Sequence, residues 1–95
     1  MRYEIVLSPE ANEDLKRLNA HDRATVQDLM KVHLRHEPAK ISKSRIKRLR
    51  GLNRPQYRLR IDEYRIFYDV SEDRVEILAI ITKSAAAKWL EEVGE

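Results

Sequence analysis

The sequence predicts an α+β fold: two N-terminal helices packed on one face of a small, mainly antiparallel sheet, with a short C-terminal helix. Three observations lead to this prediction. The chain has 95 residues, which suits one domain with one modest core. Apolar residues recur at helical spacing before Pro38, and from residue 57 onward they alternate with period two. We therefore expect residues 1–95 to form a single domain, whose sheet is an N-terminal strand plus a three-strand meander.

The first two expected elements are a strand and a helix. Residues 2–7 alternate as a strand, with one face formed by Tyr3, Ile5 and Leu7. Ser8-Pro9-Glu10 is typical of a helix start, because serine can cap, proline fits the first helical position and glutamate complements the helix dipole. Helical spacing then continues through Ala11, Leu15 and Leu18.

A second helix is expected after a break at residues 19–22, which also supplies a new cap. Its apolar stripe consists of Val26, Leu29, Met30 and His33. Pro38 ends it, and His21 is expected in the turn between the two helices. Two helices joined by a short link in a small domain most simply form an antiparallel pair.

The meander follows a basic segment, residues 39–54, which we interpret as a loop or an irregular lead-in to a strand. Residues 57–61 and 64–70 alternate with period two, and Asp62-Glu63 between them has the length of a hairpin turn. Closing that turn sets Arg60 opposite Arg65, and parity then sorts the side chains into two faces. The apolar face holds Tyr57, Leu59, Ile61, Tyr64, Ile66, Tyr68 and Val70. The other face holds Arg58, Arg60, Arg65 and Phe67.

A second turn at Glu72-Asp73 leads to the last strand. By the same parity we expect four residues of this strand on the apolar face: Val75, Ile77, Ala79 and Ile81. We expect Leu78 and Ile80 on the same face as the arginines. Like charges at facing positions are destabilising, so the three arginines need either a carboxylate or an external anion. Asp69 and Glu76 on the same face are the internal candidates.

Composition excludes several function classes. The absence of cysteine excludes a disulfide scaffold, a zinc–thiolate site and a thiol nucleophile, and it suits a cytoplasmic protein. No apolar run approaches the roughly 18 residues of a membrane span, and no signal-peptide core follows Met1. No glycine-rich phosphate loop is present, which disfavours nucleotide hydrolysis. His33 and His36 lie three apart without a further ligand, so we expect no metal and no cofactor.

Charge is distributed unevenly along the chain. The net charge is only +3, but residues 38–61 contain nine Lys and Arg and no Asp or Glu. Clustered Lys and Arg of this kind are the footprint of a polyanionic partner such as nucleic acid. The alternative is a solvated basic loop that binds nothing.

Three runs of residues carry a family resemblance. They are Lys47-Arg48-Leu49-Arg50-Gly51-Leu52, Tyr57-Arg58-Leu59-Arg60 and Glu63-Tyr64-Arg65-Ile66-Phe67-Tyr68-Asp69-Val70. Together with the order of elements they resemble the RelE/ParE superfamily of toxins from type II toxin–antitoxin pairs, over nearly the whole chain. The basic lead-in and the Tyr-Arg-Leu-Arg strand look more like the RelE branch. The resemblance to RelE implies a ribosome-dependent endoribonuclease that cuts mRNA in the A site.

In that branch the cleavage uses no metal, and the 2′-hydroxyl attacks the adjacent phosphate. The chemistry needs stabilisation of the phosphorane charge, a base and an acid. The resemblance assigns phosphate binding to Arg58, Arg60 and Arg65, whose guanidinium forks suit phosphate oxygens. Relatives carry an arginine after the last strand, and the resemblance implies that Lys83 supplies the corresponding positive charge here. The RNA-binding residues that the resemblance implies are Lys43, Arg45, Lys47, Arg48, Arg50 and Arg54.

The C-terminal segment departs from the family pattern. Ser84 stands where the relatives carry that arginine, and Leu90 stands where they carry a tyrosine. Guanidinium holds its proton too tightly for Arg58 and Arg60 to be good general bases, so proton transfer lacks a residue. Ser84 is more simply a helix cap than a nucleophile, and Trp89 with Val93 is more simply a packing pair than a base-stacking platform.

Two further functions remain open at this point. One is a ParE-like toxin that poisons DNA gyrase by protein binding. The other is a catalytically degenerate toxin that binds an antitoxin and regulates their operon. In each case the resemblance implies a cognate antitoxin, which would cover the basic surface or displace the tail helix. The ribosome and mRNA are the other expected partners, with DNA contacted only through the antitoxin complex and no membrane contact.

Overall fold

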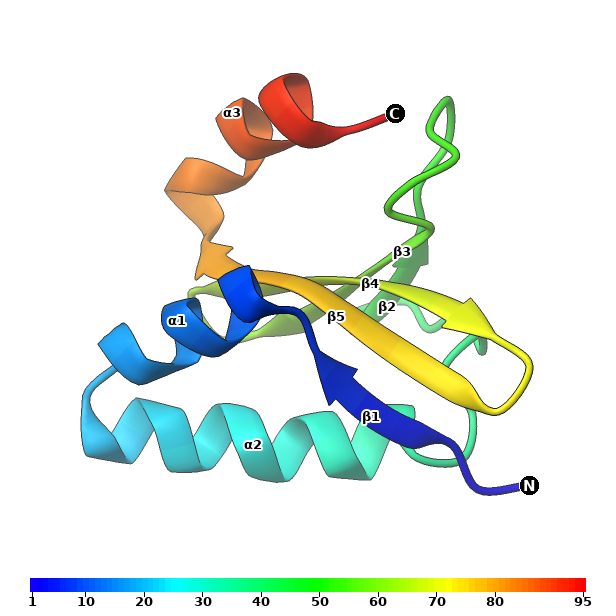
Figure 1. The fold of residues 1–95 in the computed structure, drawn as a ribbon, viewed down its shortest axis with the longest axis horizontal. Helices are drawn as coiled ribbons and strands as arrows, with labels where there is room; N and C mark the ends of the chain where they lie inside the picture. The colour runs from blue at the N-terminus through cyan, green and yellow to red at the C-terminus, as the bar shows by residue number, and fades with distance from the viewer.

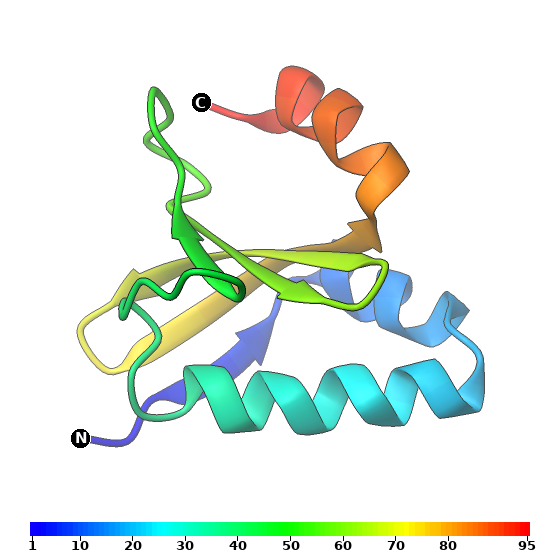
Figure 2. The same ribbon diagram turned by 180° about the vertical axis from the view of Figure 1, so that it is seen from behind.

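The computed structural model describes residues 1–95 and contains one five-stranded sheet with helices on both faces, as Figures 1 and 2 show. The elements in chain order are β1 (Glu4–Leu7), α1 (Pro9–Arg17), α2 (Ala20–Leu34), β2 (Ile46–Arg48), β3 (Tyr57–Ile61), β4 (Tyr64–Ser71), β5 (Arg74–Thr82) and α3 (Lys83–Val93). The sheet order is β1-β5-β4-β3-β2, and only the β1–β5 pair is parallel. Helices α1 and α2 cover one face and α3 lies over the other. The predicted α+β fold is confirmed.

The two N-terminal helices begin where their caps predict. The Ser8 side chain accepts a hydrogen bond from the Ala11 N–H at 3.1 Å, and Pro9 follows it as the first helical residue. The Asn19 side chain accepts from the Asp22 N–H at 2.8 Å, so α2 begins at Ala20. His21 therefore lies in the first turn of α2, and its expected place in the turn between the helices is wrong. Helices α1 and α2 run antiparallel (Figure 1). None of the three helices combines the length and the apolar character that a membrane span requires.

Part of the segment that we expected to be a loop or lead-in is a strand. Ile46, Lys47 and Arg48 pair antiparallel with Leu59, Arg58 and Tyr57, so the sheet has a fifth strand beyond the N-terminal strand and the meander. Its entry is organised by Ser42, whose Oγ accepts from the N–H groups of Arg45 and Ile46. A strand of three residues with one buried side chain, Ile46, is too short for sequence alternation to reveal it.

The meander has the predicted register between its first two strands, with Arg60 opposite Arg65 and Arg58 opposite Phe67. The last strand departs from prediction because a β-bulge shifts its register. Phe67 pairs with Ala79 and Tyr68 with Ile77, which leaves Leu78 without a partner. Helix α1 holds this bulge: Ser8 Oγ donates to the Leu78 carbonyl at 3.3 Å, and the Ile80 N–H donates to Asp14 Oδ2 at 3.0 Å.

The bulge exchanges the faces of the residues that follow it. Ile80 lies opposite Ile66 and joins the core, whereas Ile81 lies opposite Arg65 and Ala79 opposite Phe67. The predicted faces of Ala79, Ile80 and Ile81 are therefore wrong, and those of Val75 and Ile77 are confirmed. A one-residue slip inverts every later side chain, so simple parity fails beyond a bulge.

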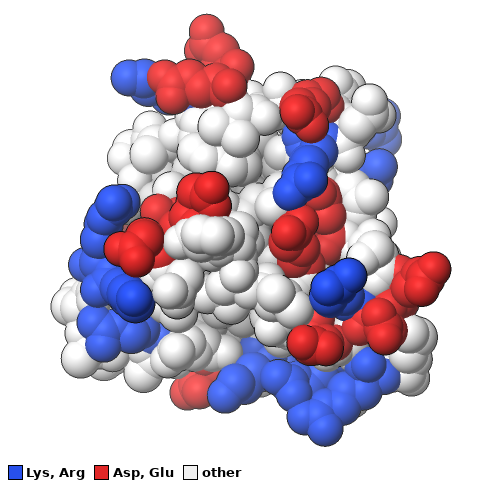
Figure 3. All heavy atoms as spheres, viewed as in Figure 1, with Lys and Arg blue, Asp and Glu red and all other residues white.

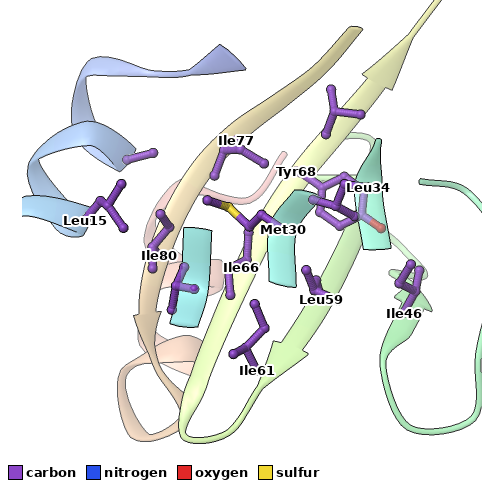
Figure 4. Packing of buried hydrophobic residues seen from close by; sticks show 13 residues of the cluster. Leu15, Met30, Leu34, Ile46, Leu59, Ile61, Ile66, Tyr68, Ile77 and Ile80 are labelled. Carbon is purple, nitrogen blue, oxygen red and sulfur yellow. The ribbon is translucent and has the colours of Figure 1, made fainter. Parts of the chain in front are cut away.

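The core lies between the sheet and the α1–α2 layer. Figure 4 shows Leu15 of α1 beside Ile80, and Met30 and Leu34 of α2 close to side chains of the central strands. The cluster of buried residues is Ala11, Leu15, Val26, Met30, Leu34, Ile46, Leu59, Ile61, Ile66, Tyr68, Val75, Ile77 and Ile80. Each fully buried aliphatic side chain contributes about 1.5–3 kcal/mol relative to exposure. This one-sided core leaves the opposite face of the sheet for another use.

Candidate nucleic-acid interface

The face of the sheet opposite the core carries four cations on neighbouring strands. Lys47 of β2 lies opposite Arg58 of β3, and Arg60 of β3 lies opposite Arg65 of β4. Because Leu59 and Ile61 point into the core, strand parity turns these four side chains to the other side, where α3 lies. We call this surface, formed by Lys47, Arg58, Arg60, Arg65 and Phe67, the arginine face. Figure 2 shows that α3 and the loop before β3 both lie on this side of the sheet.

The cations of the arginine face have no acidic neighbour. None of the ion pairs in the structure involves Lys47, Arg58, Arg60 or Arg65, so no carboxylate oxygen lies within 4 Å of their charged groups. Burial lowers the pKa of the Arg58 guanidinium, and the charges of Arg65 and Arg60 lower it further. Arg58 Nε is also buried without a hydrogen-bond partner. Unpaired buried donors and mutually repelling cations are the environment that a phosphate would stabilise.

Asp69 and Glu76 do not neutralise these arginines. Arg54 occupies both carboxylates, with Nε 3.3 Å from Asp69 Oδ2 and Nη2 2.9 Å from Glu76 Oε1. Asp69 also accepts from the Gln56 N–H at 2.7 Å. Arg54 therefore fastens the loop before β3 to the sheet. The two carboxylates that were candidates to neutralise the arginine face pair with Arg54 instead.

Arg65 is the most rigidly held cation of the arginine face. It is the one charged side chain among the buried residues, with 7% of its surface exposed. Its Nη1 donates to the carbonyls of Asp62 and Tyr64, both at 2.9 Å, in the β3–β4 turn. Arg60 on the facing strand is exposed. The pair thus combines a fixed cation with an accessible one.

Lys83 lies beside the same turn. Ile81 pairs with Arg65 at the end of β5, and the Lys83 N–H donates to the Glu63 carbonyl at 2.7 Å. Lys83 is the first residue of α3 and its side chain is exposed. The helix cap is Thr82, not Ser84 as the sequence suggests, because the strand continues without a break into the helix.

The remaining basic residues of the lead-in do not converge on one site. Arg48 lies on the other side of β2 from Lys47, with its guanidinium carbon 5.2 Å from the Tyr57 ring centre. Arg45 donates from Nη1 to the Arg60 carbonyl at 3.1 Å. Lys43 and Arg50 are exposed on loops. Of the six predicted RNA-binding residues, strand register thus assigns Lys47 to the arginine face and Arg48 to the opposite face.

The aromatic side chains are committed to packing. The rings of Phe67 and Trp89 stack with centres 5.0 Å apart, which fastens α3 to the sheet and confirms Trp89 as a packing residue. Val93 of the expected packing pair is exposed. On the core side, the Tyr64 hydroxyl donates to Asp22 at 2.7 Å and the Tyr68 hydroxyl to the Pro38 carbonyl at 2.6 Å. Neither tyrosine hydroxyl is placed to transfer a proton on the arginine face.

Lys47 is the residue whose position sequence reasoning missed. Without β2 there is no register to set it opposite Arg58, and it reads only as one of many loop cations. The signal is weak, because the residues at 46–49 are Ile46-Lys47-Arg48-Leu49, whose apolar residues do not alternate with period two. No group of three or more His, Cys, Asp and Glu side chains comes together in the structure, and His33 and His36 line a separate hollow beside β2.

Comparison with solved structures shows which proteins share this fold. The chain is similar to a chain of the RelBE2 toxin–antitoxin complex of Mycobacterium tuberculosis, with 23% identity and a TM-score of 0.72 over 87% of this chain and 100% of the other. It is similar to a chain of the RelE–RelB complex of Pyrococcus horikoshii, with 22% identity and a TM-score of 0.71 over 87% and 97%. The YoeB–YefM complex of Staphylococcus aureus gives 24% identity and a TM-score of 0.65 over 84% and 95%.

These likenesses establish the RelE-like fold. A family model described as the ParE toxin of type II toxin–antitoxin systems matches residues 5–87. The chain therefore belongs to the ParE toxin family, within the RelE/ParE superfamily. No curated protein matches the sequence. The preference for the RelE branch stays a prediction, because the family model is that of ParE and the solved structures are those of RelE-type toxins.

Proposed function

We propose that residues 1–95 act as one toxin domain that cuts mRNA on the ribosome, in the cytoplasm, by attack of a 2′-hydroxyl on the adjacent phosphate. The observation that carries this proposal is the arginine face: three guanidinium groups and a lysine on one side of the sheet, with no carboxylate within 4 Å. Arg58, Arg60 and Arg65 are the proposed ligands of the scissile phosphate. Their positive charge stabilises the additional negative charge of the phosphorane.

Two lysines flank the three arginines across the sheet. In strand order, Lys47 of β2 comes before Arg58 and Arg60, and Lys83 follows β5 on the far side of Arg65. In-line displacement removes a proton from the attacking 2′-oxygen and delivers one to the leaving 5′-oxygen on the opposite side. We assign these two proton transfers to Lys47 and Lys83, because an amine can exchange a proton whereas guanidinium retains its own. The products are a cyclic phosphate and a free 5′-hydroxyl.

The test is primer extension on an mRNA under translation, with the purified chain and with its Arg65→Ala and Arg60→Ala variants. The expected result is cleavage by the natural chain and a loss of about 10²-fold in each variant. Lys88→Ala is the matched control, because Lys88 is an exposed cation of α3 that pairs with Glu92, and this variant should cleave normally. Absence of cleavage by the natural chain contradicts the proposal. A circular-dichroism melt of Arg65→Ala shows whether its loss reflects unfolding, and Arg60→Ala does not depend on a buried group.

A second candidate function is poisoning of DNA gyrase by protein binding. The observation that favours it is the match to the ParE family model. A gyrase cleavage-complex assay separates the two candidates: accumulation of cleaved plasmid with no mRNA cleavage supports gyrase as the target. The arginine face would then be a docking surface instead of a catalytic one.

We also propose a cognate antitoxin as a protein partner, with DNA contacted only through the toxin–antitoxin complex. Support comes from the similar solved structures, several of which are described as toxin–antitoxin complexes. Co-expression of the chain with the neighbouring small reading frame, followed by co-purification, tests this pairing.

A further inference from the structure

Two carboxylates lie on the same side of the sheet as the arginine face. Asp69 of β4 is paired with Glu76 of β5. Phe67 and Asp69 are two residues apart on β4 and therefore share a face, and Phe67 lies opposite Arg58. Asp69 is thus a diagonal neighbour of Arg58, at a spacing of about 7–8 Å that long side chains can span. An ion pair between Asp69 and Arg58 would neutralise the cation whose Nε has no partner.

That ion pair does not form, because both oxygens of Asp69 have other partners. Oδ1 accepts from the Gln56 N–H at 2.7 Å, and Oδ2 lies 3.3 Å from Arg54 Nε. The other end of the same guanidinium, Nη2 of Arg54, lies 2.9 Å from Glu76 Oε1. Arg54 therefore bridges two facing carboxylates that would otherwise repel each other. In Figure 3, Lys and Arg atoms right of the centre lie directly against Asp and Glu atoms, so this part of the surface carries both signs of charge.

The backbone around Arg54 is fixed from two sides. The Glu95 N–H donates to the Arg54 carbonyl at 2.8 Å, and the Glu95 carbonyl accepts from the Arg54 N–H, so the segment after α3 holds this residue. On the side of the sheet, Gln56 Oε1 accepts from the Val70 N–H at 2.8 Å. These bonds hold the loop before β3 where the Arg54 side chain reaches both carboxylates.

Without Arg54, the Asp69 carboxylate would need another cation. Burial raises the pKa of Asp69, whereas the Gln56 N–H and the charge of Arg54 lower it. Arg48 lowers this pKa as well, but its Nη1 is bound to the Gln56 carbonyl at 2.7 Å. Arg58, the diagonal neighbour on the same face, is then the cation that is free to pair with Asp69.

We propose that Arg54 is a positioning residue of the phosphate site, which holds Asp69 and Glu76 so that neither carboxylate pairs with Arg58. Arg54 acts through the carboxylates and does not itself touch the phosphate. A carboxylate and a phosphate compete for the same guanidinium donors, so an ion pair with Asp69 would remove one ligand of the phosphate. This role rests on the proposed function, because it requires a phosphate site on the arginine face. It differs from the direct RNA contact that the sequence predicts for Arg54.

The test compares the Arg58 Nε–H signal by NMR in the natural chain, in Arg54→Gln, and in Arg54→Gln with Asp69→Asn. With no ligand present, the signal should shift in Arg54→Gln, because Asp69 then approaches Arg58, and it should return in the double variant. Asparagine keeps the oxygen that accepts from the Gln56 N–H but carries no charge. Titration with a DNA trinucleotide then measures phosphate affinity. Arg54→Gln should bind about tenfold more weakly than the natural chain, and Asp69→Asn should restore the affinity.

A second double variant separates this local effect from net charge. Arg54→Gln with Glu13→Gln has the net charge of the natural chain, +3, as does Arg54→Gln with Asp69→Asn. Glu13 is an exposed carboxylate of α1, on the other side of the sheet, so this variant should bind as weakly as Arg54→Gln alone. A merely structural role of Arg54 would give no recovery in either double variant.

A circular-dichroism melt shows whether Arg54→Gln is folded. If it is not, Arg54→Lys takes its place in the same measurements. A single ammonium group does not bridge two carboxylates as the guanidinium fork does, so the Arg58 signal should move in the same direction by less.

Three results would overturn the proposal: an unmoved Arg58 signal in the variants at position 54, no recovery of affinity with Asp69→Asn, or equal recovery with Glu13→Gln. Absence of mRNA cleavage by the natural chain contradicts the proposed function, whereas the Arg58 and trinucleotide measurements still decide the role of Arg54. Failure of the two proposals is thus seen in separate experiments.

Discussion

The two faces of the sheet differ in whether their polar groups have partners within the fold. On the core face two tyrosine hydroxyls have partners within the fold, Pro38 for the buried Tyr68 and Asp22 for the partly buried Tyr64, and aliphatic side chains fill the remaining space. On the arginine face, Arg58 has a buried Nε with no partner and stands among cations with no carboxylate within 4 Å. The two tyrosine hydroxyls of the first face are satisfied within the fold, whereas the cations of the second face are open to an external partner.

The plane of the sheet thus separates the packed core from the proposed phosphate site. Repulsion among neighbouring cations costs stability, and burying an unpaired donor costs more. Arg54 shows that the chain contains carboxylates able to neutralise an arginine, since it pairs with Asp69 and Glu76. The arginine face lacks such partners, which is the arrangement expected of a surface that receives phosphate.

The largest expected effect is on the core face. Ile66→Ala removes a fully buried side chain and should lower the free energy of unfolding by about 2–5 kcal/mol. Arg60→Ala, at an exposed position on the opposite face, should change it by no more than about 0.5 kcal/mol. Urea denaturation of both variants measures the contrast. Comparable destabilisation by the two substitutions would contradict the claim that the core face, and not the arginine face, stabilises the fold.

The next effect concerns the proton-transfer assignment. Lys47→Arg keeps the positive charge opposite Arg58 but supplies a group that retains its proton, so mRNA cleavage should fall about 10²-fold. Single-turnover cleavage on translating ribosomes gives the rate, and binding to those ribosomes should be unchanged. Full activity of Lys47→Arg would show that Lys47 acts through its charge alone.

Much of the fold is predictable from the sequence because local signals agree with it. Ser8-Pro9 and Asn19 mark the starts of α1 and α2, and the Asp62-Glu63 turn fixes the register that puts Arg60 opposite Arg65. The bulge at Leu78 is not predictable in this way, since Ser8 and Asp14, at the cap and within α1, hold it from 70 and 66 residues earlier in the chain. Contacts of that separation leave no local pattern.

The candidate site likewise contains some residues whose positions the sequence predicts and others whose positions it does not. Arg58, Arg60 and Arg65 follow from hairpin parity, which needs only the turn. The place of Lys47 depends on β2, which is three residues long and is held by pairing with β3 and by the burial of Ile46. The pairing of Arg54 with Asp69 and Glu76 depends on the path of the loop before β3, which composition shows only as a basic run.

A smaller effect tests how fully the core face satisfies its polar groups. Tyr68→Phe removes the hydroxyl that donates to the Pro38 carbonyl and leaves that acceptor without its donor. The free energy of unfolding should fall by about 1–3 kcal/mol, measured by urea denaturation. No change would mean that this hydrogen bond is not needed to anchor the segment after α2.

The smallest effect is a pH dependence at the edge of the core face. The Tyr64 hydroxyl lowers the pKa of Asp22, with a further contribution from His21. The ionised carboxylate is thus favoured in the folded chain, so this contribution is present above the pKa of the unfolded carboxyl and is lost as pH falls through the lowered folded value. In Tyr64→Phe the Asp22 pKa should move back toward its ordinary value, as followed by NMR of the carboxyl carbon. An unchanged pKa would assign the lowering to His21 and Asn19 instead of Tyr64.

The most direct test of the central claim observes the unpartnered Nε–H of Arg58 by NMR while a DNA trinucleotide, which lacks the attacking 2′-hydroxyl, is titrated in. Arg23 is the internal control, because its Nε is also buried without a partner but it lies at the start of α2, away from the arginine face. A phosphate site on the arginine face predicts that the Arg58 signal shifts progressively and that the Arg23 signal stays in place. An unmoved Arg58 signal, or equal shifts at both arginines, would contradict it.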